Sequence, residues 1–495
     1  MREVGDREKQ RSIKPVKLNN SNVYDVICDV AEGLDRETAY AQINKYIIAR
    51  LRLFKGNNAR KTLYFIAEKE YVETEWKDMV SMHYINTSYS FKNTVMRFHL
   101  FSIPKVDQES YLGFFTLRSI DEIKIMLSMI YPNWPNITMG QVAYVMTYDK
   151  KIHLYGITLE IKTYPIFVQD MVVTKCAHAV IVSATKYLNE KHRLKKVKLT
   201  DIINSYTYSR VKSFPSSGLS SQQILEIFDK NNIPITCEEL TLDFANNMVN
   251  EDIGLDKIKD KLKPGIDSWV ESAIPVILGI SFKKDEEYVH HVVQIIGHTA
   301  GEEHNYVLYD DSGVLSETLN GQRDFAIIVS WKQLKQVMKY SDYVIYPQYE
   351  KVYMGYDNMI ERLCDYQKIL MNNIDYQNKF GMLGRLPFKE ARCLLADNAD
   401  IKDFLHRKKG DSILQKKYVD STIDTVIEKN LPHYLWYCEI KLADKMFLVF
   451  LANPTYNTQT TKNIFINKEH LILSDRVSLL TKTKDKKIER KSEKK

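Results

Sequence analysis

One cysteine in the chain stands where a nucleophile can be activated. Cys176 lies in the stretch YPIFVQDMVVTKCAHAVIVSATKYL (164–188), where a loop gives way to a predicted helix. A thiol in the first turn of a helix sees the positive end of the helix dipole and unpaired backbone N–H groups, and both favour the reactive thiolate. The alternative interpretation is a cysteine that serves only as a small buried hydrophobic residue.

The helix that follows this cysteine is predicted from the spacing of its apolar residues. Thr174 is the expected N-cap, two residues before the cysteine. From Ala177 onward the apolar residues recur at helical intervals, at Val180, Ile181, Ala184, Tyr187 and Leu188. We therefore expect a helix with one apolar face and with Cys176 in its first turn.

Three strand-like segments downstream can supply partners for the thiol. They are residues 274–282, 288–297 and 305–310. Their apolar runs and polar turns favour an antiparallel meander. His290 and His291 are adjacent in the second segment, so they must point to opposite faces of the strand. Asp310 and Asp311 end the third segment, within reach of one of the two histidines.

These residue types together can perform nucleophilic catalysis. A cysteine at a helix start, a histidine on a strand and a carboxylate on the next strand can act as nucleophile, general base and orienting acid. Asp310 would fix the imidazole tautomer, and the imidazolium would hold the thiolate of Cys176. Gln169, upstream of the cysteine, could donate a hydrogen bond to the oxyanion of the reaction intermediate.

With these residues in place, residues 160–350 resemble the papain-like cysteine peptidase superfamily, and most closely its branch of bacteriocin-leader-processing peptidases and their bacterial relatives. Besides Gln169 and the Cys176 helix, the motifs that carry the resemblance are GLSSQQILEIFDKNNI (218–233), IPVILGI (274–280), HVVQIIG (291–297) and YVLYDDSG (306–313). The resemblance implies Cys176 as nucleophile, His291 as base, Asp310 as orienting residue and Gln169 as oxyanion donor. It implies no cofactor and no metal.

Three departures from the family pattern leave alternative site residues. Ala177–His178 replaces the usual small residue and turn after the cysteine. The gap from Gln169 to the cysteine is one residue longer than usual, so that Asp170 stands at the expected offset. Asp311 could serve in place of Asp310, and His290 in place of His291. The combination of QDxxVxxCA with the upstream strand YLGFFTLR resembles uncharacterised bacterial proteins that embed such a domain between flanking regions.

Three other functions compete with hydrolysis. The thioacyl intermediate can pass its acyl group to an amine, as in a transglutaminase-like acyltransferase, or the enzyme can deamidate glutamine. The scaffold can also be a catalytically inactive binding module. A metal site is the third alternative, although neither HExxH nor CxxC organises its candidate ligands. Those candidates are His178, His290, His291, His298, His304, Asp310 and Asp311.

The predicted fold class is α+β, a papain-like domain whose helix carries the cysteine and whose antiparallel sheet carries the histidine and aspartate, flanked by α/β regions. The predicted segments are a disordered N-terminus (1–22), an α/β domain (23–160), the papain-like domain (161–350), a helix-plus-hairpin domain (351–480) and a basic disordered tail (481–495). The length of 495 residues supports such a multi-domain layout.

Further elements are predicted from periodicity and turn residues. Helices are expected over 35–54, 220–232, 256–263 (ended by Pro264–Gly265), 359–374, 388–408 and 418–431. Strands are expected over 63–67, 95–101, 111–117, 142–148, 153–161, 431–440 and 445–453. Residues 120–131 fit a helix or a strand equally well.

The net charge and the cysteine content indicate which partners and which cellular compartment to expect. The net charge is +7, but residues 482–495 carry eight basic and three acidic side chains, so the rest of the chain is near +2. This argues against a nucleic-acid partner, and the family resemblance implies a peptide or protein substrate. The N-terminus lacks an apolar signal segment, no apolar run is long enough to span a membrane, and the six cysteines form no CxxC pair. A cytoplasmic protein with free thiols is therefore expected, while the pattern leaves its oligomeric state open.

Overall fold

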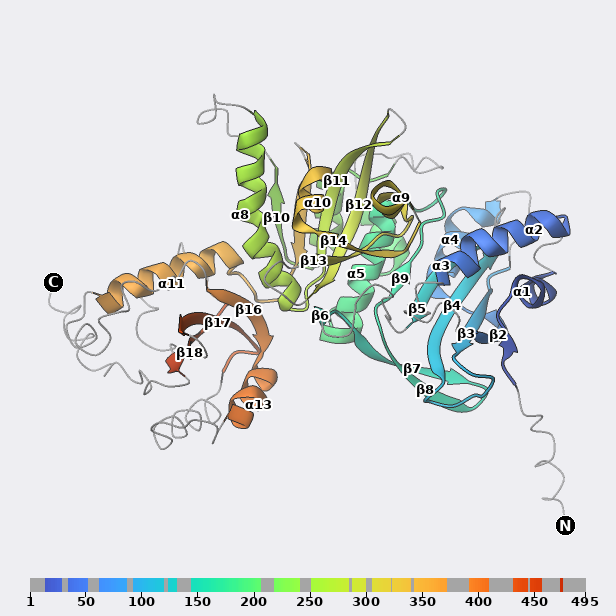
Figure 1. The fold of residues 1–495 in the computed structure, drawn as a ribbon, viewed down its shortest axis with the longest axis horizontal. Coiled ribbons are helices and arrows are strands. Elements are labelled where there is room, and N and C mark those ends of the chain that lie inside the picture. The colour runs from blue at the N-terminus through green and yellow to red at the C-terminus, as the bar shows by residue number, and fades with distance from the viewer. Residues whose placement is uncertain are drawn as a thin grey trace, which may run out of the picture. The chain divides into compact units, whose positions relative to one another are not determined.

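The structure is a computed structural model. It describes residues 14–28, 34–51, 62–86, 92–119, 123–130, 144–205, 218–240, 251–284, 287–299, 305–321, 323–339, 342–371, 391–408, 431–443, 446–455 and 472–474. The chain forms two compact units, the first of Met1–Asp256 and Ile274–Pro347 and the second of Lys257–Ala273 and Gln348–Lys495. Helices and antiparallel sheets are both present, which confirms the α+β class (Figure 1).

The first sheet of the first unit has six antiparallel strands. Their order is β1 (Val16–Lys17), β2 (Tyr64–Tyr71), β3 (Val95–Phe101), β4 (Tyr111–Ser119), β5 (Ile123–Ile130) and β9 (Ile166–Phe167). The associated helices are α1 (Asn20–Ile27), α2 (Arg36–Ile43), the π-helix η1 (Asn44–Ile48), α3 (Ala49–Leu51), α4 (Thr74–Met82) and the 3₁₀ turn η3 (Tyr84–Asn86). The predicted strands at 63–67, 95–101 and 111–117 are thus confirmed as parts of β2, β3 and β4.

Several predictions for this region need correction. Residues 14–22 are not disordered, because β1 pairs with β2 and the Asn19 side chain caps α1 by accepting from the backbone N–H of Asn22. Residues 1–13 lie outside the described residues. The ambiguous segment 120–131 contains strand β5. The single strand predicted over 153–161 is instead a hairpin of β7 (Tyr148–Leu154) and β8 (Ile157–Thr163), because Gly156 adopts a φ of 86° and turns the chain.

The second sheet of the first unit carries the predicted meander. Its order is β10 (Ile235–Glu239), β15 (Tyr343–Pro347), β11 (Val276–Lys284), β12 (Glu287–His298), β13 (Asn305–Tyr309) and β14 (Ala326–Ser330). The short strand β6 (Tyr144–Val145) also pairs with β12. A Cβ on Gly297 would lie 2.2 Å from the Tyr144 carbonyl oxygen, so this pairing requires glycine.

Helix α5 (Cys176–His192) is the central helix of the first unit. The five apolar residues predicted to form its buried face, Val180, Ile181, Ala184, Tyr187 and Leu188, are all fully buried. It packs against β12 of the second sheet and β9 of the first, and is therefore buried over most of its circumference (Figure 1). The other helices of this unit are α6 (Leu199–Ser205), α7 (Ser221–Lys230), α9 (Val314–Asn320) and α10 (Trp331–Val337). In α7 the predicted capping box of Ser220 and Gln223 is confirmed.

The second unit combines helices with one antiparallel sheet. The sheet order is β16 (Arg392–Asp397), β17 (Tyr434–Ala443), β18 (Met446–Ala452) and β19 (Ile472–Ser474). The helices are α11 (Tyr356–Met371), α13 (Asn398–Lys408) and the Lys257–Glu271 part of α8 (Glu251–Glu271). The predicted pair of strands around Ala443 is confirmed as β17 and β18.

Two predicted helices in this part are present, but one ends later and the other begins later than predicted. Pro264 does not end a helix but lies inside α8, whose residues Ile266, Trp269 and Val270 are buried. Burial of these side chains outweighs the roughly 3 kcal/mol that an internal proline costs. The helix predicted over 388–408 is a strand, β16, followed by α13, because 392–397 alternates between buried and less buried positions. The helix at 418–431, apart from its last residue, and the tail 481–495 lie outside the described residues.

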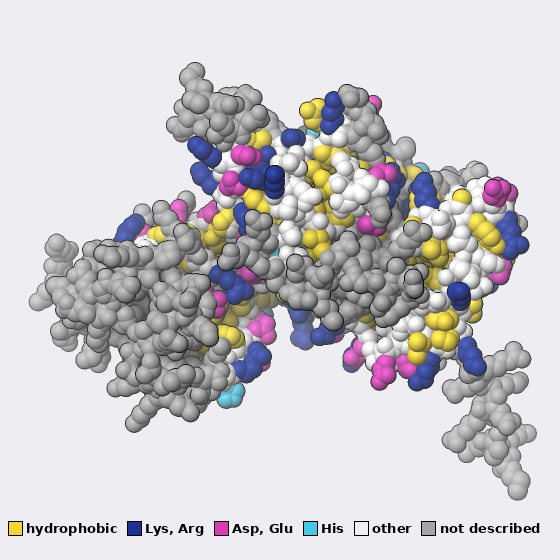
Figure 2. Space-filling view, in the orientation of Figure 1, with side chains coloured by type: hydrophobic (Ala, Val, Ile, Leu, Met, Phe, Trp, Pro, Cys, Tyr) yellow, Lys and Arg dark blue, Asp and Glu magenta, His cyan; other side chains and the backbone are white. Residues whose placement is uncertain are grey.

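Two further features of the described residues concern membrane association and surface charge. Among the described residues, none of the helices combines the length and apolar character needed to cross a bilayer. On the face drawn in Figure 2, basic and acidic side chains of the described residues are interspersed.

Candidate active site

Cys176 is the first residue of α5, as the sequence predicts, but the N-cap differs from the prediction. The capping position is occupied by Lys175 instead of Thr174. The Thr174 hydroxyl donates to Asp170 Oδ1 at 3.0 Å and accepts from the Asp170 backbone N–H at 3.0 Å, so it closes the preceding loop. His178 also caps the first turn of α5, because its Nδ1 accepts a hydrogen bond from the backbone N–H of Lys175 at 3.3 Å.

Asp170 holds the loop that delivers Cys176 to the site. Its Oδ1 accepts from the backbone N–H groups of three successive residues, Val172 (3.1 Å), Val173 (2.9 Å) and Thr174 (2.7 Å). Its Oδ2 accepts from the Tyr84 hydroxyl at 2.7 Å. Both carboxylate oxygens are therefore used to shape the loop, and an ionised carboxylate has no proton to donate to an oxyanion.

Gln169 is held by its backbone. Its N–H donates to Asp311 Oδ2 at 3.2 Å, and its carbonyl oxygen accepts from Arg118 Nη1 at 3.0 Å. Asp311 is fully buried, so it anchors this segment to the end of β13 instead of orienting a histidine. The expectation that the Gln169 amide serves as oxyanion donor stays a prediction.

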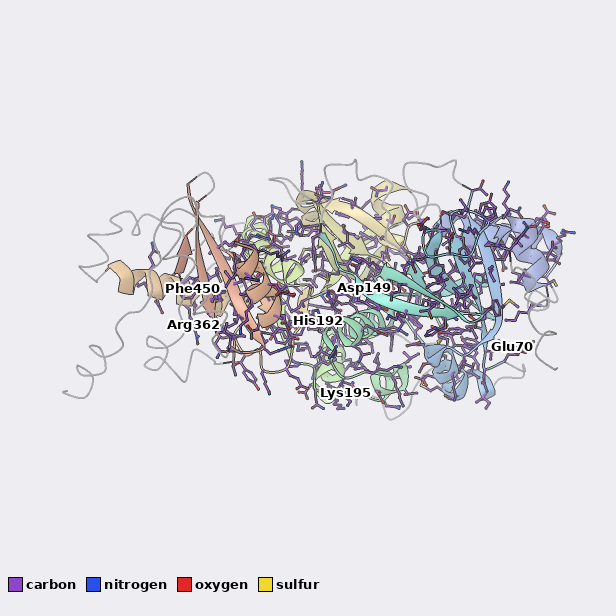
Figure 3. All side chains as sticks on the ribbon, turned by 90° about the horizontal axis from the view of Figure 1, so that it is seen from below. Glu70, Asp149, His192, Lys195, Arg362 and Phe450 are labelled. Atoms are coloured by element: carbon purple, nitrogen blue, oxygen red, sulfur yellow. The ribbon has the colours of Figure 1, made fainter. Side chains whose placement is uncertain are left out.

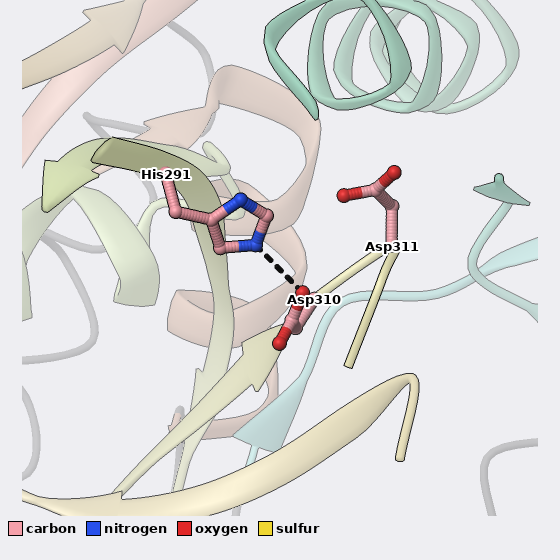
Figure 4. Close-up of side chains that lie close together, drawn as sticks. All are labelled: His291, Asp310 and Asp311. Carbon is pink, nitrogen blue, oxygen red and sulfur yellow. Dashed lines mark hydrogen bonds and ion pairs between the residues drawn. The ribbon is translucent and has the colours of Figure 1, made fainter. Parts of the chain in front are cut away.

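His291 and Asp310 form a buried pair. His291 Nε2 lies 2.7 Å from Asp310 Oδ1, and the exposed fractions of the two residues are 5% and 0% (Figure 4). Figure 4 marks a hydrogen bond from His291 to Asp310 and none to Asp311. The structure thus pairs Asp310, and not Asp311, with the histidine.

The surroundings of Asp310 fix its carboxylate. Oδ2 accepts from the backbone N–H groups of Leu315 (2.9 Å) and Ser316 (3.4 Å) in the first turn of α9. Oδ1 accepts from the backbone N–H and the hydroxyl of Ser312, both at 3.2 Å. Burial alone would raise the pKa of Asp310, but the charge and hydrogen bond of His291 and these backbone donors lower it.

Cys176 reaches the same imidazole. Burial is the strongest single influence on His291 and lowers its pKa. The charge and hydrogen bond of Asp310, together with a side-chain hydrogen bond and charge interaction with Cys176, outweigh burial and raise the pKa of His291 well above its ordinary value. Because Nε2 faces Asp310, the ring nitrogen left for the thiol is Nδ1. The imidazole therefore lies between a thiol and a carboxylate.

Among the described residues, the other candidate histidines do not join this cluster. His290 Nδ1 lies 2.8 Å from the hydroxyl of Ser281, the residue opposite it on β11. His178 is buried, and burial lowers its pKa to about 4. His298 Nδ1 contacts the carbonyl oxygen of Thr299 at 3.1 Å. His304 lies outside the described residues.

A metal ion is the alternative for part of this site. One potential ligand atom from each of His291, Asp310 and Asp311 lies within 4.8 Å of the other two. However, Asp310 directs both oxygens at backbone N–H groups and His291, and Asp311 Oδ2 accepts from Gln169. This donor set fits a hydrogen-bonded histidine–carboxylate pair better than an open coordination site.

Two residues near the site escaped the sequence interpretation. Ser312 places its hydroxyl 3.4 Å from His291 Nε2, beside Asp310. Tyr343 on β15 lies near Cys176. Burial, and in second place the negative charge of a Cys176 thiolate, raise the pKa of the Tyr343 phenol. A Cβ on Gly279 would lie 2.5 Å from the Tyr343 ring, so the ring can approach only because residue 279 is a glycine. A glycine within the apolar strand 274–282 is the sequence feature that could have indicated this close approach.

Comparisons with known proteins give no further assignment: no protein-family model matches the chain, and no curated protein matches it.

Proposed function

We propose that the chain is a papain-like cysteine hydrolase, most specifically a peptidase that cleaves a peptide or protein substrate. The observation that carries the proposal is the contact of one buried imidazole, His291, with both Cys176 and Asp310. Nucleophile, base and orienting acid come from a helix start, a strand and the end of the next strand, which is the arrangement of roles that thiol hydrolysis needs.

The proposed reaction proceeds in two steps. The Cys176 thiolate attacks the scissile carbonyl carbon, and the His291 imidazolium gives its proton to the departing amine, so that a thioester to Cys176 remains. The neutral imidazole then takes a proton from water as the resulting hydroxide attacks the thioester carbonyl. Breaking of the carbon–sulfur bond releases the carboxylic acid and restores the Cys176 thiolate beside the His291 imidazolium. Asp310 keeps the imidazole in one tautomer and stabilises its charged form throughout.

The negative oxygen of each tetrahedral intermediate needs a donor. The backbone N–H groups in the first turn of α5 lie beside Cys176, at the positive end of the helix dipole. In this proposal the Gln169 amide is the second donor, because its backbone is anchored on both sides by Asp311 and Arg118.

The proposal includes a reducing, cytoplasmic setting. All six cysteines belong to the described residues, and all six are free thiols. A nucleophilic cysteine remains active only where the surroundings keep it reduced.

The test is digestion of a peptide library derived from a whole proteome, in water enriched in heavy oxygen, with new termini identified by mass spectrometry. We expect new carboxyl termini that carry one heavy oxygen, because water resolves the thioester. Transfer to an amine would instead give new amide-linked products without heavy oxygen, and deamidation would convert glutamine to labelled glutamate without new termini.

Two variants complete the design. Cys176→Ala should give no products, whereas Cys237→Ala, which removes a half-buried cysteine of the same unit, should digest the library like the native chain. Products from Cys176→Ala would refute the mechanism. A native chain that leaves every peptide intact would favour the inactive binding module.

A further inference from the structure

A polar cavity lies in the first unit, and its lining does not include Cys176, His291 or Asp310. Its volume is about 340 Å³. The walls come from the first sheet, the β7–β8 hairpin, helix α5 and the segment that precedes α6. Cavities of this size accommodate one small molecule.

Two buried carboxyl groups form one end of the cavity. The exposed fractions of Glu73 and Glu75 are 3% and 6%. Glu73 Oε2 accepts from the Thr116 hydroxyl at 2.8 Å, and Glu75 Oε1 accepts from Lys186 Nζ at 2.5 Å. The two other oxygens, Glu73 Oε1 and Glu75 Oε2, are buried, and apart from a carboxyl proton shared between Glu73 and Glu75 they have no donor among the described residues. When that proton leaves, both oxygens need another donor, which a bound group can supply.

These carboxyl groups share one proton at neutral pH. Burial, and then the negative charge of Glu75, raise the pKa of Glu73 to about 8. Burial also acts to raise the pKa of Glu75, but the charge and hydrogen bond of Lys186 lower it below its ordinary value. The set of Glu73, Glu75 and Lys186 is therefore electrically neutral with the proton on Glu73, and becomes able to hold one more positive charge when that proton leaves.

The rim of the cavity is basic, in contrast to the two buried carboxyl groups. Lys150, Lys151 and Lys196 line the cavity there, whereas Arg97, the other basic lining residue besides Lys186, is buried and paired with Glu68. Lys151 has 71% of its side chain exposed and pairs with Glu160, and Lys150 forms an ion pair with Glu190. Figure 3 labels Asp149 and Lys195, the residues immediately before Lys150 and Lys196, and so marks the two segments that bring these lysines to the rim.

We propose that this cavity binds a small zwitterion of the α-amino-acid type, with its ammonium group on the Glu73–Glu75 pair and its carboxylate at the lysine rim. Two carboxylates would then face two ammonium groups at the buried end, a balanced set. Leu127, Met129 and Val182 provide an apolar wall for the ligand's side chain. A simple anion cannot supply the donor that replaces the Glu73 proton, and a simple cation leaves the lysines at the rim without a ligand group.

Release of the Glu73 proton is the signature of this binding mode. The charged and titratable groups that face Glu73 from the packed elements are Tyr71 of β2, Arg97 of β3, Glu75 of α4, Lys150 and His153 of β7, Lys186 and Glu190 of α5, and Lys196. An arriving ammonium group favours the ionised form of Glu73. Given a pKa of about 8, binding at pH 7 should release about 0.9 of a proton.

The experiment is isothermal titration calorimetry of the full chain with each standard amino acid, in phosphate and in Tris at pH 7. The difference between the two buffers gives the number of protons released. We expect at least one amino acid to bind with the proton release given above. Removing its amine (the des-amino acid) or masking its carboxylate (the methyl ester) should weaken binding more than tenfold.

Variants locate the site. Glu73→Gln should abolish proton release and weaken binding about tenfold, because glutamine copies the neutral carboxyl but cannot ionise. Glu109→Gln, the same change on an exposed residue away from the cavity, should have no effect. Lys196→Gln changes an exposed residue and so leaves the fold intact, yet it should weaken binding by removing a partner of the ligand carboxylate.

Three results would overturn the proposal: no heat of binding with any amino acid, a des-amino acid that binds as tightly as its parent, or binding without proton release. The proposal is independent of the chemistry at Cys176, because its measurement does not involve turnover.

Discussion

At the scale of single residues, the site depends on the competition between burial and charge at His291. Removing an imidazolium from water is costly, and burial is the largest influence on this group. Asp310 and Cys176 supply negative charge on both sides of the ring and reverse the effect. The backbone donors of α9 hold Asp310 in place, so the ring orientation is fixed before any substrate arrives.

The two adjacent histidines should therefore differ sharply in their contribution to catalysis. His291→Ala should lower kcat/KM for a cleaved peptide by about 100-fold to 10,000-fold, the range expected for loss of a general base. His290→Ala removes only a contact with Ser281 and should retain most activity. Rates measured on one peptide from the library digest check this, and equal losses in the two variants would contradict the assignment.

The site residues could be predicted to different degrees from the sequence. Strand alternation separated His290 from His291, and the family resemblance chose between them. Thr174 was predicted as the N-cap because its type and position fit, but Asp170, four residues earlier in the same loop, binds its hydroxyl. Tyr343 could not be placed, since its approach to Cys176 depends on β15 lying beside β11, and that strand order is not written in local sequence patterns.

At the scale of elements, the loop between β9 and α5 positions the nucleophile. Asp170 gathers three backbone N–H groups, the Thr174 hydroxyl and the Tyr84 hydroxyl around one carboxylate. Met171 adopts a φ of 69°, which the closed loop imposes on a non-glycine residue. This element is built from hydrogen bonds more than from apolar packing.

Loss of the Asp170 carboxylate should loosen this element. Asp170→Ala leaves several buried N–H groups without an acceptor and should lower the free energy of unfolding by about 3 kcal/mol. Asp170→Asn keeps one acceptor oxygen and should cost less, about 1 kcal/mol. Urea denaturation of the full chain measures both values. Asp149→Ala, at an exposed aspartate of the same unit, is the control, and an effect as large as that of Asp170→Ala would refute the role of the loop.

Elements with strong local patterns could be predicted, and those settled by packing could not. Strand β3 and the capped helix α7 match their predictions because alternation and the Ser220–Gln223 capping box are local features. Helix α8 continues through Pro264 because its buried face stabilises it, and this energy is invisible in propensities. The 153–161 segment was predicted as one strand because strand-like residues stand on both sides of its two turn residues, Tyr155 and Gly156, and hide the turn between them.

At the scale of the whole molecule, the second unit is discontinuous in sequence. Residues Lys257–Ala273 precede the last strands of the first unit but belong to the second. Within the second unit, Trp269 packs edge-on against Trp436 at 5.2 Å, and Ser268 of α8 and Ser272, just after α8, hydrogen-bond to backbone atoms of β16. The sequence predicted a C-terminal region beginning at residue 351, because composition and periodicity do not reveal which earlier helix joins a later sheet.

The α8 contact should be essential to the second unit. Trp269→Ala removes a side chain with an exposed fraction of 1% and should lower the stability of this unit by about 3 to 5 kcal/mol. Scanning calorimetry of the full chain should show one transition shifted to lower temperature. Tyr353→Ala, at an aromatic residue of the same unit that is 57% exposed, should leave the profile nearly unchanged, and a comparable shift would argue against the role of α8.

The most direct test of the central claim is the rate at which iodoacetamide alkylates each cysteine of the native chain at pH 6, followed by mass spectrometry. An ordinary thiol is only about 0.3% thiolate at this pH, and a neighbouring imidazolium such as that of His291 favours the more reactive thiolate. Allowing for the lower nucleophilicity of a stabilised thiolate, Cys176 should react about tenfold or more faster than the exposed Cys28. His291→Ala should remove this difference. Equal labelling of Cys176 and Cys28 in the native chain, or a rate at Cys176 that His291→Ala leaves unchanged, would contradict the account.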